Sequence, residues 1–257
     1  MTIAKTGLVV WHDLFTPNLE RATAFFQRVA GWTFRTERAA DFAWGGGEKD
    51  FVLALSGDEA GAGLAETPPG MTGGWIAYVE VDDVDAAAKR AETLGGEIVR
   101  RPFDVPGVGR TALGRDPLGA LFGLSLSRHG FPAPRTQFGP EIHMSDRAAF
   151  PEAFYGEVLD WRTEAPHAPD PAGEGVVGPS GDQVAIRLST KPRERSRAAW
   201  APTIRVASPD EALAAAEALG ARVHEDRFAD AGGAGRVFLC EYEGAQFFLC
   251  DAEIAGR

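Results

Sequence analysis

The sequence predicts an α+β protein made of one domain duplicated in tandem, and two internal repeats support this prediction. The segment from Trp75 to Phe103 returns at an offset of 125 residues as the segment from Trp200 to Phe228. A shorter segment, AFFQRVAGW at 24–32, returns at an offset of 129 as AFYGEVLDW at 153–161. Self-similarity over tens of residues indicates a repeated architecture. A chain of 257 residues also suits two domains near the common size of roughly 100–150 residues.

We expect the first domain to span 1–127 and the second to span 141–257, joined by a linker at 128–140. The linker region contains three prolines and shows no hydrophobic period, which is typical of a connection between domains. Within each domain, the order strand, helix, strand, strand, strand is expected to occur twice.

The elements of the first domain follow from local patterns taken in order. Residues 8–15 are rich in β-branched and aromatic side chains, which predicts a strand. Apolar residues at helical spacing predict a helix over 18–30 that Gly31 ends. Either Asn18, or Thr16 with Pro17 in the first turn, can cap this helix. The later elements are predicted as strands at 32–36, 41–44 and 51–55, a Gly-, Ala- and Pro-rich loop at 57–73, a strand at 75–81, a helix at 84–95, and strands at 97–100, 110–113 and 120–126.

The second domain is predicted to repeat this plan with shorter or less regular segments. Its strands are predicted at 141–145, 184–188, 202–207, 222–225, 236–241 and 245–250, its helices at 150–159 and 209–219, and its loops at 165–175 and 190–199.

Composition excludes several classes of partner. The net charge is −11, and the one small cluster of basic residues, at 191–197, is typical of a solvated loop, so nucleic acid is not an expected partner. No apolar run approaches the roughly 20 residues of a membrane helix. The first residues lack the apolar core of a signal peptide, so we expect a cytoplasmic protein.

The two cysteines, Cys240 and Cys250, flank a predicted hairpin near the C-terminus. A disulfide between them is sterically conceivable. Two buried thiols are the interpretation that better suits a cytoplasmic protein.

Three groups of residues give the chain a resemblance to a known superfamily. They are Trp11-His12-Asp13-Leu14 with Phe25-Phe26 and Gly31-Trp32; Val81 to Ala86 with Leu94-Gly95-Gly96; and Asp116 to Ala120. Together they resemble the vicinal-oxygen-chelate superfamily of glyoxalases, bleomycin-resistance proteins and extradiol dioxygenases, over most of 7–127 and more loosely over 139–251. The resemblance implies paired βαβββ modules that form a cup of antiparallel strands with helices outside. In metal-dependent members the cup holds a divalent ion.

The resemblance also implies where metal ligands would stand, namely on the first strand, on the strand before the second helix and on the last strand. Carried over by spacing, these positions hold Trp11, Ile76 and Gly123 in the first domain and Pro140, Ala201 and Phe248 in the second. None of these side chains supplies a metal ligand, and a divalent ion needs several converging N, O or S donors. We therefore expect neither a metal nor another cofactor.

Aromatic and acidic residues are expected to line the first cup instead. The expected ligand-binding residues are Trp11, Asp13, Phe15, Trp44, Tyr78 and Glu80. Strand alternation places Asp13 on the face of Trp11, and Glu80 on the face of Tyr78. Asp13 could act as a general base, anchor a cationic group, or be a structural residue, and Glu80 is open to the same alternatives. His12 and His143 fall on the opposite face and are predicted to be structural.

The function that we favour from the sequence is metal-free binding of a small, aromatic or cationic organic molecule, as in drug sequestration, rather than catalysis. One alternative is a glyoxalase-like lyase or isomerase, or a dioxygenase, with an atypical metal site. A second is a structural or regulatory protein whose cups are packed shut. Either a monomer or a homodimer is compatible with the tandem design, and we expect the first cup to be the functional one.

Overall fold

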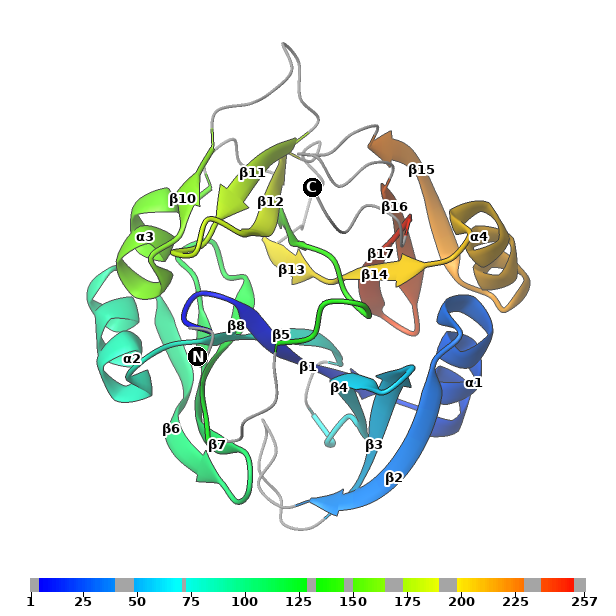
Figure 1. Cartoon of the computed structure of the whole chain (residues 1–257), viewed down its shortest axis with the longest axis horizontal. Helices are drawn as coiled ribbons and strands as arrows, with labels where there is room; N and C mark the ends of the chain where they lie inside the picture. Colours follow the sequence, from blue (N-terminus) through cyan, green and yellow to red (C-terminus); the bar gives the residue numbers. More distant parts are fainter. Residues whose placement is uncertain are drawn as a thin grey trace.

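The computed structural model describes residues 5–39, 49–70, 73–128, 133–145, 150–164, 173–189, 198–228 and 237–251. Within these ranges the α+β class and the tandem organisation are confirmed (Figure 1). The first domain contains β1 (Val9–Thr16), α1 (Leu19–Ala30), β2 (Thr33–Ala39), β3 (Lys49–Ser56), β4 (Glu59–Glu66), β5 (Gly74–Glu80), α2 (Val84–Thr93), β6 (Glu97–Val105), β7 (Gly109–Arg115) and β8 (Leu121–Ser127). The domain boundaries at 127 and 141 stay predictions.

The eight strands of the first domain form one sheet in the order β2-β3-β4-β1-β5-β8-β7-β6. Neighbouring strands are antiparallel except that β1 pairs in parallel with β4, and β5 with β8. The expected antiparallel cup is therefore a mixed sheet. The reason is that the last strand of each βαβββ module returns beside the first strand and runs in the same direction. The sheet curves through the lower half of Figure 1.

Strand β4 corrects the loop predicted over 57–73. Residues 59–66, EAGAGLAE, pair with both β3 and β1. Ala and Gly have low strand propensity, so the sequence favoured a loop. Packing requires them here, because the ring of Phe51 lies where a side chain at Gly63 would stand.

The second domain contains β9 (Glu141–Ser145), α3 (Glu152–Leu159), β10 (Arg162–Thr163), β11 (Gly173–Val177), β12 (Gln183–Ser189), β13 (Ala199–Ala201), β14 (Thr203–Val206), α4 (Pro209–Ala218), β15 (Arg222–Phe228), β16 (Val237–Tyr242) and β17 (Ala245–Asp251). These strands form two sheets, β10-β11-β12-β9-β13 and β14-β17-β16-β15. The strand predicted at 202–207 corresponds to β14, whereas β13 lies just before it and overlaps the end of the loop predicted at 190–199. Pro202, which has no amide hydrogen to donate to a neighbouring strand, separates β13 from β14. Strand β11 overlaps the end of the loop predicted at 165–175.

The helices of the two domains pack against each other in crossed pairs. Figure 1 shows α1 beside α4 and α2 beside α3. Phe25 and Phe26 of α1 share one core with Phe247 of β17, and Ala91 of α2 shares another with Tyr155 of α3. Both main cores therefore bridge the two domains. No helix in the described ranges is long and apolar enough to cross a membrane.

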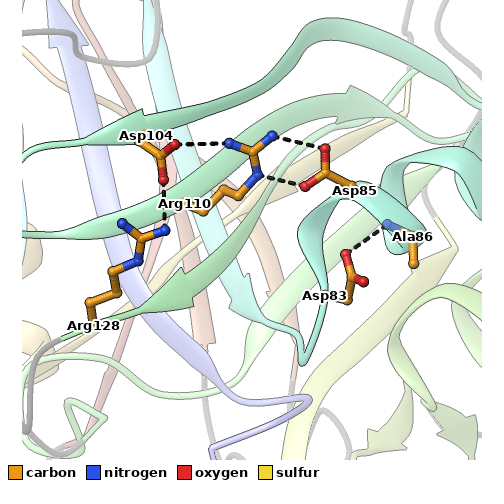
Figure 2. Close-up of polar contacts among 6 residues, drawn as sticks. All are labelled: Asp83, Asp85, Ala86, Asp104, Arg110 and Arg128. Carbon is orange, nitrogen blue, oxygen red and sulfur yellow. Dashed lines mark hydrogen bonds and ion pairs between the residues drawn. The ribbon is translucent and has the colours of Figure 1, made fainter.

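An arginine on the outside of the first domain ties α2 to the β6–β7 hairpin. Arg110 donates to both carboxylate oxygens of Asp85 in the first turn of α2 and to Asp104 of β6, which Arg128 also contacts (Figure 2). The hydrogen bond from Arg110 lowers the pKa of Asp85. Asp83 caps the same helix through the amide of Ala86. These contacts are exposed, so we assign them a structural role.

The cysteines are both buried and free. Cys240 lies in the core shared with α1, and Cys250 lies on the inner face of the second domain. Because the two side chains project from opposite faces of the β16–β17 pair, they cannot bridge. Burial raises the pKa of the Cys240 thiol to about 12 and that of Cys250 to about 11.

Candidate functional site

The first cup, as we use the term, is the concave face of the eight-stranded sheet. Its apolar cluster contains Phe15, Phe51, Ala65, Ile76, Tyr78 and Leu113, with Trp11, Leu53, Val99 and Leu121 packed against it. Five of the six residues expected there from the sequence come from β1 and β5: Trp11, Asp13 and Phe15, and Tyr78 and Glu80. Trp44 lies outside the described residues.

Asp13 is the most unusual polar group of the first cup. Its carboxylate accepts hydrogen bonds from Nε1 of Trp11 and from the hydroxyl of Tyr78, each at 2.8 Å. Burial raises the pKa of Asp13 to about 6, and the hydrogen bonds from Trp11 and Tyr78 oppose this rise. Asp13 thus lies in an apolar cup, and its charge is stabilised mainly by two aromatic donors.

Two aromatic rings cover two glycines on either side of Asp13. The ring of Phe51 lies over Gly63 of β4, and the ring of Tyr78 lies over Gly123 of β8. Asp13 of β1 pairs with Gly63 of β4, and Tyr78 of β5 pairs with Gly123 of β8. In each half of the cup, the first strand of the module therefore pairs with a glycine on the last strand. Trp11 stacks on Phe51 with ring centroids 6.2 Å apart. Trp11 is half-buried, so part of the residue is accessible to solvent.

Glu80 is buried but already has partners. Its carboxylate accepts hydrogen bonds from the amide and the hydroxyl of Ser127. This arrangement favours the structural alternative for Glu80, which fixes the end of β8 against β5.

Each histidine lies on the face of its own sheet that is opposite the concave face, as alternation predicts: His12 in β1 and His143 in β9. His12 contacts Glu141 of β9 through Nε2 at 2.7 Å and stacks on Phe138. His143 contacts Asp116 at 2.9 Å, and Tyr155 donates to the same carboxylate. Both histidines are buried between the domains.

Arg100 is a cup residue that the sequence analysis did not single out. It pairs with Leu113, a member of the cup cluster, and its guanidinium carbon lies 3.2 Å from the ring centroid of Phe103. Simple alternation from Ile98, which packs against the α2 core, would place Arg100 on the outer face. Pro102 was the available signal, because proline inside a strand often marks a bulge.

The metal that this fold would accommodate in other proteins does not fit the residues of the first cup. The positions derived by spacing hold Trp11, Ile76 and Gly123. If the positions on β1 and β5 are shifted by two residues, they hold Asp13, which pairs with Gly63, and Tyr78, which pairs with Gly123. Either set supplies at most one carboxylate and one phenol, fewer than a divalent ion requires. Among the described residues, no group of three or more His, Cys, Asp or Glu side chains converges.

Two cavities lined by described residues lie outside the first cup. One, of about 10 Å³, lies between the domains, and its lining includes Glu141, Tyr155 and Trp200. It has room for about one water molecule. The other, of about 280 Å³, is an open groove along α4 and β15–β16.

Comparison with known proteins identifies the family. Residues 8–124 match the family model described as the Glyoxalase/Bleomycin resistance protein/Dioxygenase superfamily, and residues 144–250 match a Glyoxalase-like domain. The chain belongs to the vicinal-oxygen-chelate superfamily. The tandem superfamily domains expected from the sequence are thereby confirmed.

Two curated relatives match about half of this chain. The protein named "Putative glyoxylase CFP32" from Mycobacterium tuberculosis (strain CDC 1551 / Oshkosh) is 35% identical over 120 residues, which cover 47% of this chain and 44% of that protein. The anthracycline biosynthesis protein DnrV from Streptomyces peucetius is 32% identical over 131 residues, 48% of each chain. The alignments thus span about half the length of these relatives.

Two solved structures share the fold at low identity. The 2,3-dioxygenase LapB from Pseudomonas sp. KL28 has a TM-score of 0.61 at 15% identity, over 96% of this chain and 93% of that one. The Mn(II)-bound glyoxalase from Novosphingobium aromaticivorans has a TM-score of 0.59 at 12% identity, over 99% and 87%. These likenesses establish the architecture, whereas function depends on the residues of the site.

Proposed function

We propose that this protein binds a small aromatic molecule in the first cup without a metal, with Asp13 as the polar anchor. The observation that carries the proposal is the buried Asp13 carboxylate, held by Trp11 and Tyr78 beneath a half-buried indole. Apolar walls with a few placed polar groups are the usual composition of a small-molecule site. A carboxylate retained in such a wall costs folding energy, which a ligand that donates to it would offset.

The residues at the candidate metal-ligand positions, and the name of one relative, support this assignment. The candidate metal positions carry indole, aliphatic and glycine residues, so a chelating substrate would lack its ion here. The relative DnrV is named for anthracycline biosynthesis, and an anthracycline is a fused-ring aromatic compound. A flat ring system of this kind could stack on the half-buried indole of Trp11.

Tryptophan fluorescence tests the proposal. We expect an anthracycline, or another compound in a panel of fused-ring aromatics, to quench the emission of the wild-type protein saturably. Trp11→Phe should remove most of the quenching, and Asp13→Asn should weaken binding by about tenfold, the effect of losing one hydrogen bond to a charged group. Trp32→Phe is the matched control, because Trp32 is buried in the opposite core and its Nε1 makes no hydrogen bond within the described part of the chain. Quenching that survives in Trp11→Phe, or none across the panel, would refute the assignment.

A second candidate function is metal-free proton transfer, and the pKa of Asp13 near 6 favours it. A general base works best when its pKa lies near the working pH. Asp13 would take a proton from carbon next to a carbonyl group and return it at a neighbouring atom, which amounts to isomerisation. Asp13→Asn would then abolish turnover of a carbonyl substrate while retaining binding, and loss of binding and turnover in parallel would contradict this role.

We further propose that the protein acts in the cytoplasm, where two buried thiols would stay reduced. Because the helices of its two halves pair within one chain, a monomer can complete the fold.

A further inference from the structure

Two bulges in β6 turn a charged side chain into the first cup. Ile98 pairs with Gly114 on the outer face, Arg100 pairs with Leu113, and Phe103 pairs with Thr111. The register shifts between Ile98 and Arg100, and again between Arg100 and Phe103. A bulge inserts one extra residue and so reverses the face of those that follow. Without the first bulge, Arg100 would share the outer face of Ile98.

Arg100 then ends a row of residues that crosses the cup. Successive strand pairs place Trp11 beside Tyr78, Tyr78 beside Gly123, Gly123 beside Leu113, and Leu113 beside Arg100. Asp13 lies at the Trp11 end of the row, hydrogen-bonded to Trp11 and Tyr78. The charge of Arg100 also reaches Tyr78, because it lowers the pKa of the Tyr78 hydroxyl against the larger effect of burial. The cup therefore has an acidic end and a basic end, with Tyr78 between them.

We propose that the aromatic ligand of the first cup carries an acidic oxygen, a phenolate or a carboxylate, that pairs with Arg100 at the end away from Asp13. This inference rests on the function proposed above and specifies its ligand class. It replaces the cationic ligand that the sequence alone suggested with one that donates a hydrogen bond at Asp13 and presents an anion at Arg100.

The placement of Arg100 suits this role. A guanidinium is planar, and stacking on a ring fixes the orientation of that plane, in which two N–H groups can meet two oxygens of a planar anion. The Phe103 ring holds the guanidinium carbon at 3.2 Å from its centroid. Arg100 is half-buried, so an ion pair there is screened less than one at the surface. Among the described residues, Glu80 also brings a carboxylate to the cup, and this carboxylate accepts hydrogen bonds from the amide and the hydroxyl of Ser127.

Three matched probes test the charge preference. The probes are 2-naphthoate, 2-naphthamide and 2-naphthylmethylammonium, which share one ring system and differ in charge. We expect the wild type to bind the naphthoate about tenfold more tightly than the amide, and the ammonium compound least tightly. Arg100→Met should remove the preference for naphthoate. Arg100→Lys keeps a positive charge but lacks the planar guanidinium, so it should retain part of the preference. Arg101→Met is the control, because Arg101 is the neighbouring residue with the same charge and is exposed.

The outcomes separate this inference from the function beneath it. Equal weakening by Arg100→Met and Arg101→Met, or tighter binding of the ammonium compound than of the naphthoate, would overturn the inference and leave aromatic binding intact. Absence of any Trp11-dependent binding of all three probes would instead count against the proposed function. A thermal melt of each variant checks folding. If Arg100→Met fails to fold, the preference for naphthoate over naphthamide is compared between Arg100→Lys and the wild type.

Discussion

At the scale of single residues, the Asp13 carboxyl is governed by opposing influences. Burial disfavours its charge, whereas the hydrogen bonds from Trp11 and Tyr78 favour it, and burial is the largest influence, so the pKa rises to about 6. At neutral pH the group is mostly ionised and can accept a hydrogen bond from a ligand. Near pH 5 it is mostly protonated.

This pKa predicts how stability depends on pH. Because the pKa of Asp13 is higher in the folded protein than in the unfolded chain, the folded state binds the proton more tightly. The contribution of Asp13 is therefore most favourable below the unfolded pKa, near 4, and is lost as pH rises through about 6. The change is on the order of 2–3 kcal/mol. Urea unfolding at several pH values between 4 and 7 should show Asp13→Asn gaining stability relative to wild type as pH rises.

The control for this prediction is Asp58→Asn, which changes an exposed carboxyl in the turn between β3 and β4. Its stability relative to wild type should vary little across the same range. A flat difference between Asp13→Asn and wild type would show that Asp13 titrates as an ordinary carboxyl.

The cup-facing residues of β1 and β5 could be predicted from the sequence, and Arg100 could not. Trp11, Asp13 and Tyr78 lie in the regular stretch of β1–β5 pairing that follows a register shift between Val9 and Trp11, and within this stretch period-2 alternation assigns a face reliably. Arg100 follows a bulge, and a bulge moves every later side chain to the other face. The hydrogen bonds that hold Asp13 depend on ring orientations across two strands, which spacing along one strand does not specify.

At the scale of elements, a glycine in β8 allows Tyr78 to reach Asp13. A Cβ atom at Gly123 would lie 2.2 Å from the nearest atom of the Tyr78 ring. Gly123→Ala should therefore displace the ring, break its hydrogen bond to Asp13, and lower the free energy of unfolding by about 1–3 kcal/mol. Urea unfolding measures the loss, and binding of the aromatic probes should weaken with it.

The matched substitution is Gly139→Ala, where the nearest atom, on Thr203, lies 3.4 Å from the added Cβ. That distance is ordinary contact, so stability should change little. If Gly123→Ala were as stable as Gly139→Ala, the ring of Tyr78 would be freer to move than the packing around it indicates.

The same packing explains which elements the sequence could predict. Helices α1 and α2 have clear caps at Asn18 and Asp83 and a regular apolar period, and both were predicted within two residues at each end. Strand β4 was predicted as a loop because its glycines and alanines carry no strand signal. Gly63 is needed because the Phe51 ring lies over it. This is a contact between strands, and local strand propensity does not include it.

At the scale of the whole molecule, the two domains meet at equivalent positions. The offset of 129 residues that relates the first helices also relates His12 to Glu141, and these two side chains contact each other at 2.7 Å. They are 1% and 2% exposed, so this pair is shielded from water. A second buried contact, between Asp116 and His143, joins the domains again, and Trp200 extends it by donating to Tyr155. The halves are therefore coupled by polar contacts as well as by the shared helix cores.

This coupling predicts a strong interaction between His12 and Glu141 in a double-mutant cycle. His12→Leu leaves the buried Glu141 carboxylate without its partner and should cost about 3–5 kcal/mol, and Glu141→Leu should cost a similar amount. Replacing both with leucine removes the uncompensated groups together, so the double variant should recover much of the loss. Urea unfolding of the four proteins should give a coupling energy above about 2 kcal/mol, with one transition for the whole chain. Additive losses within about 0.5 kcal/mol would mean that the apolar helix cores alone hold the domains together, whereas separate transitions for the two halves would contradict strong coupling of any kind.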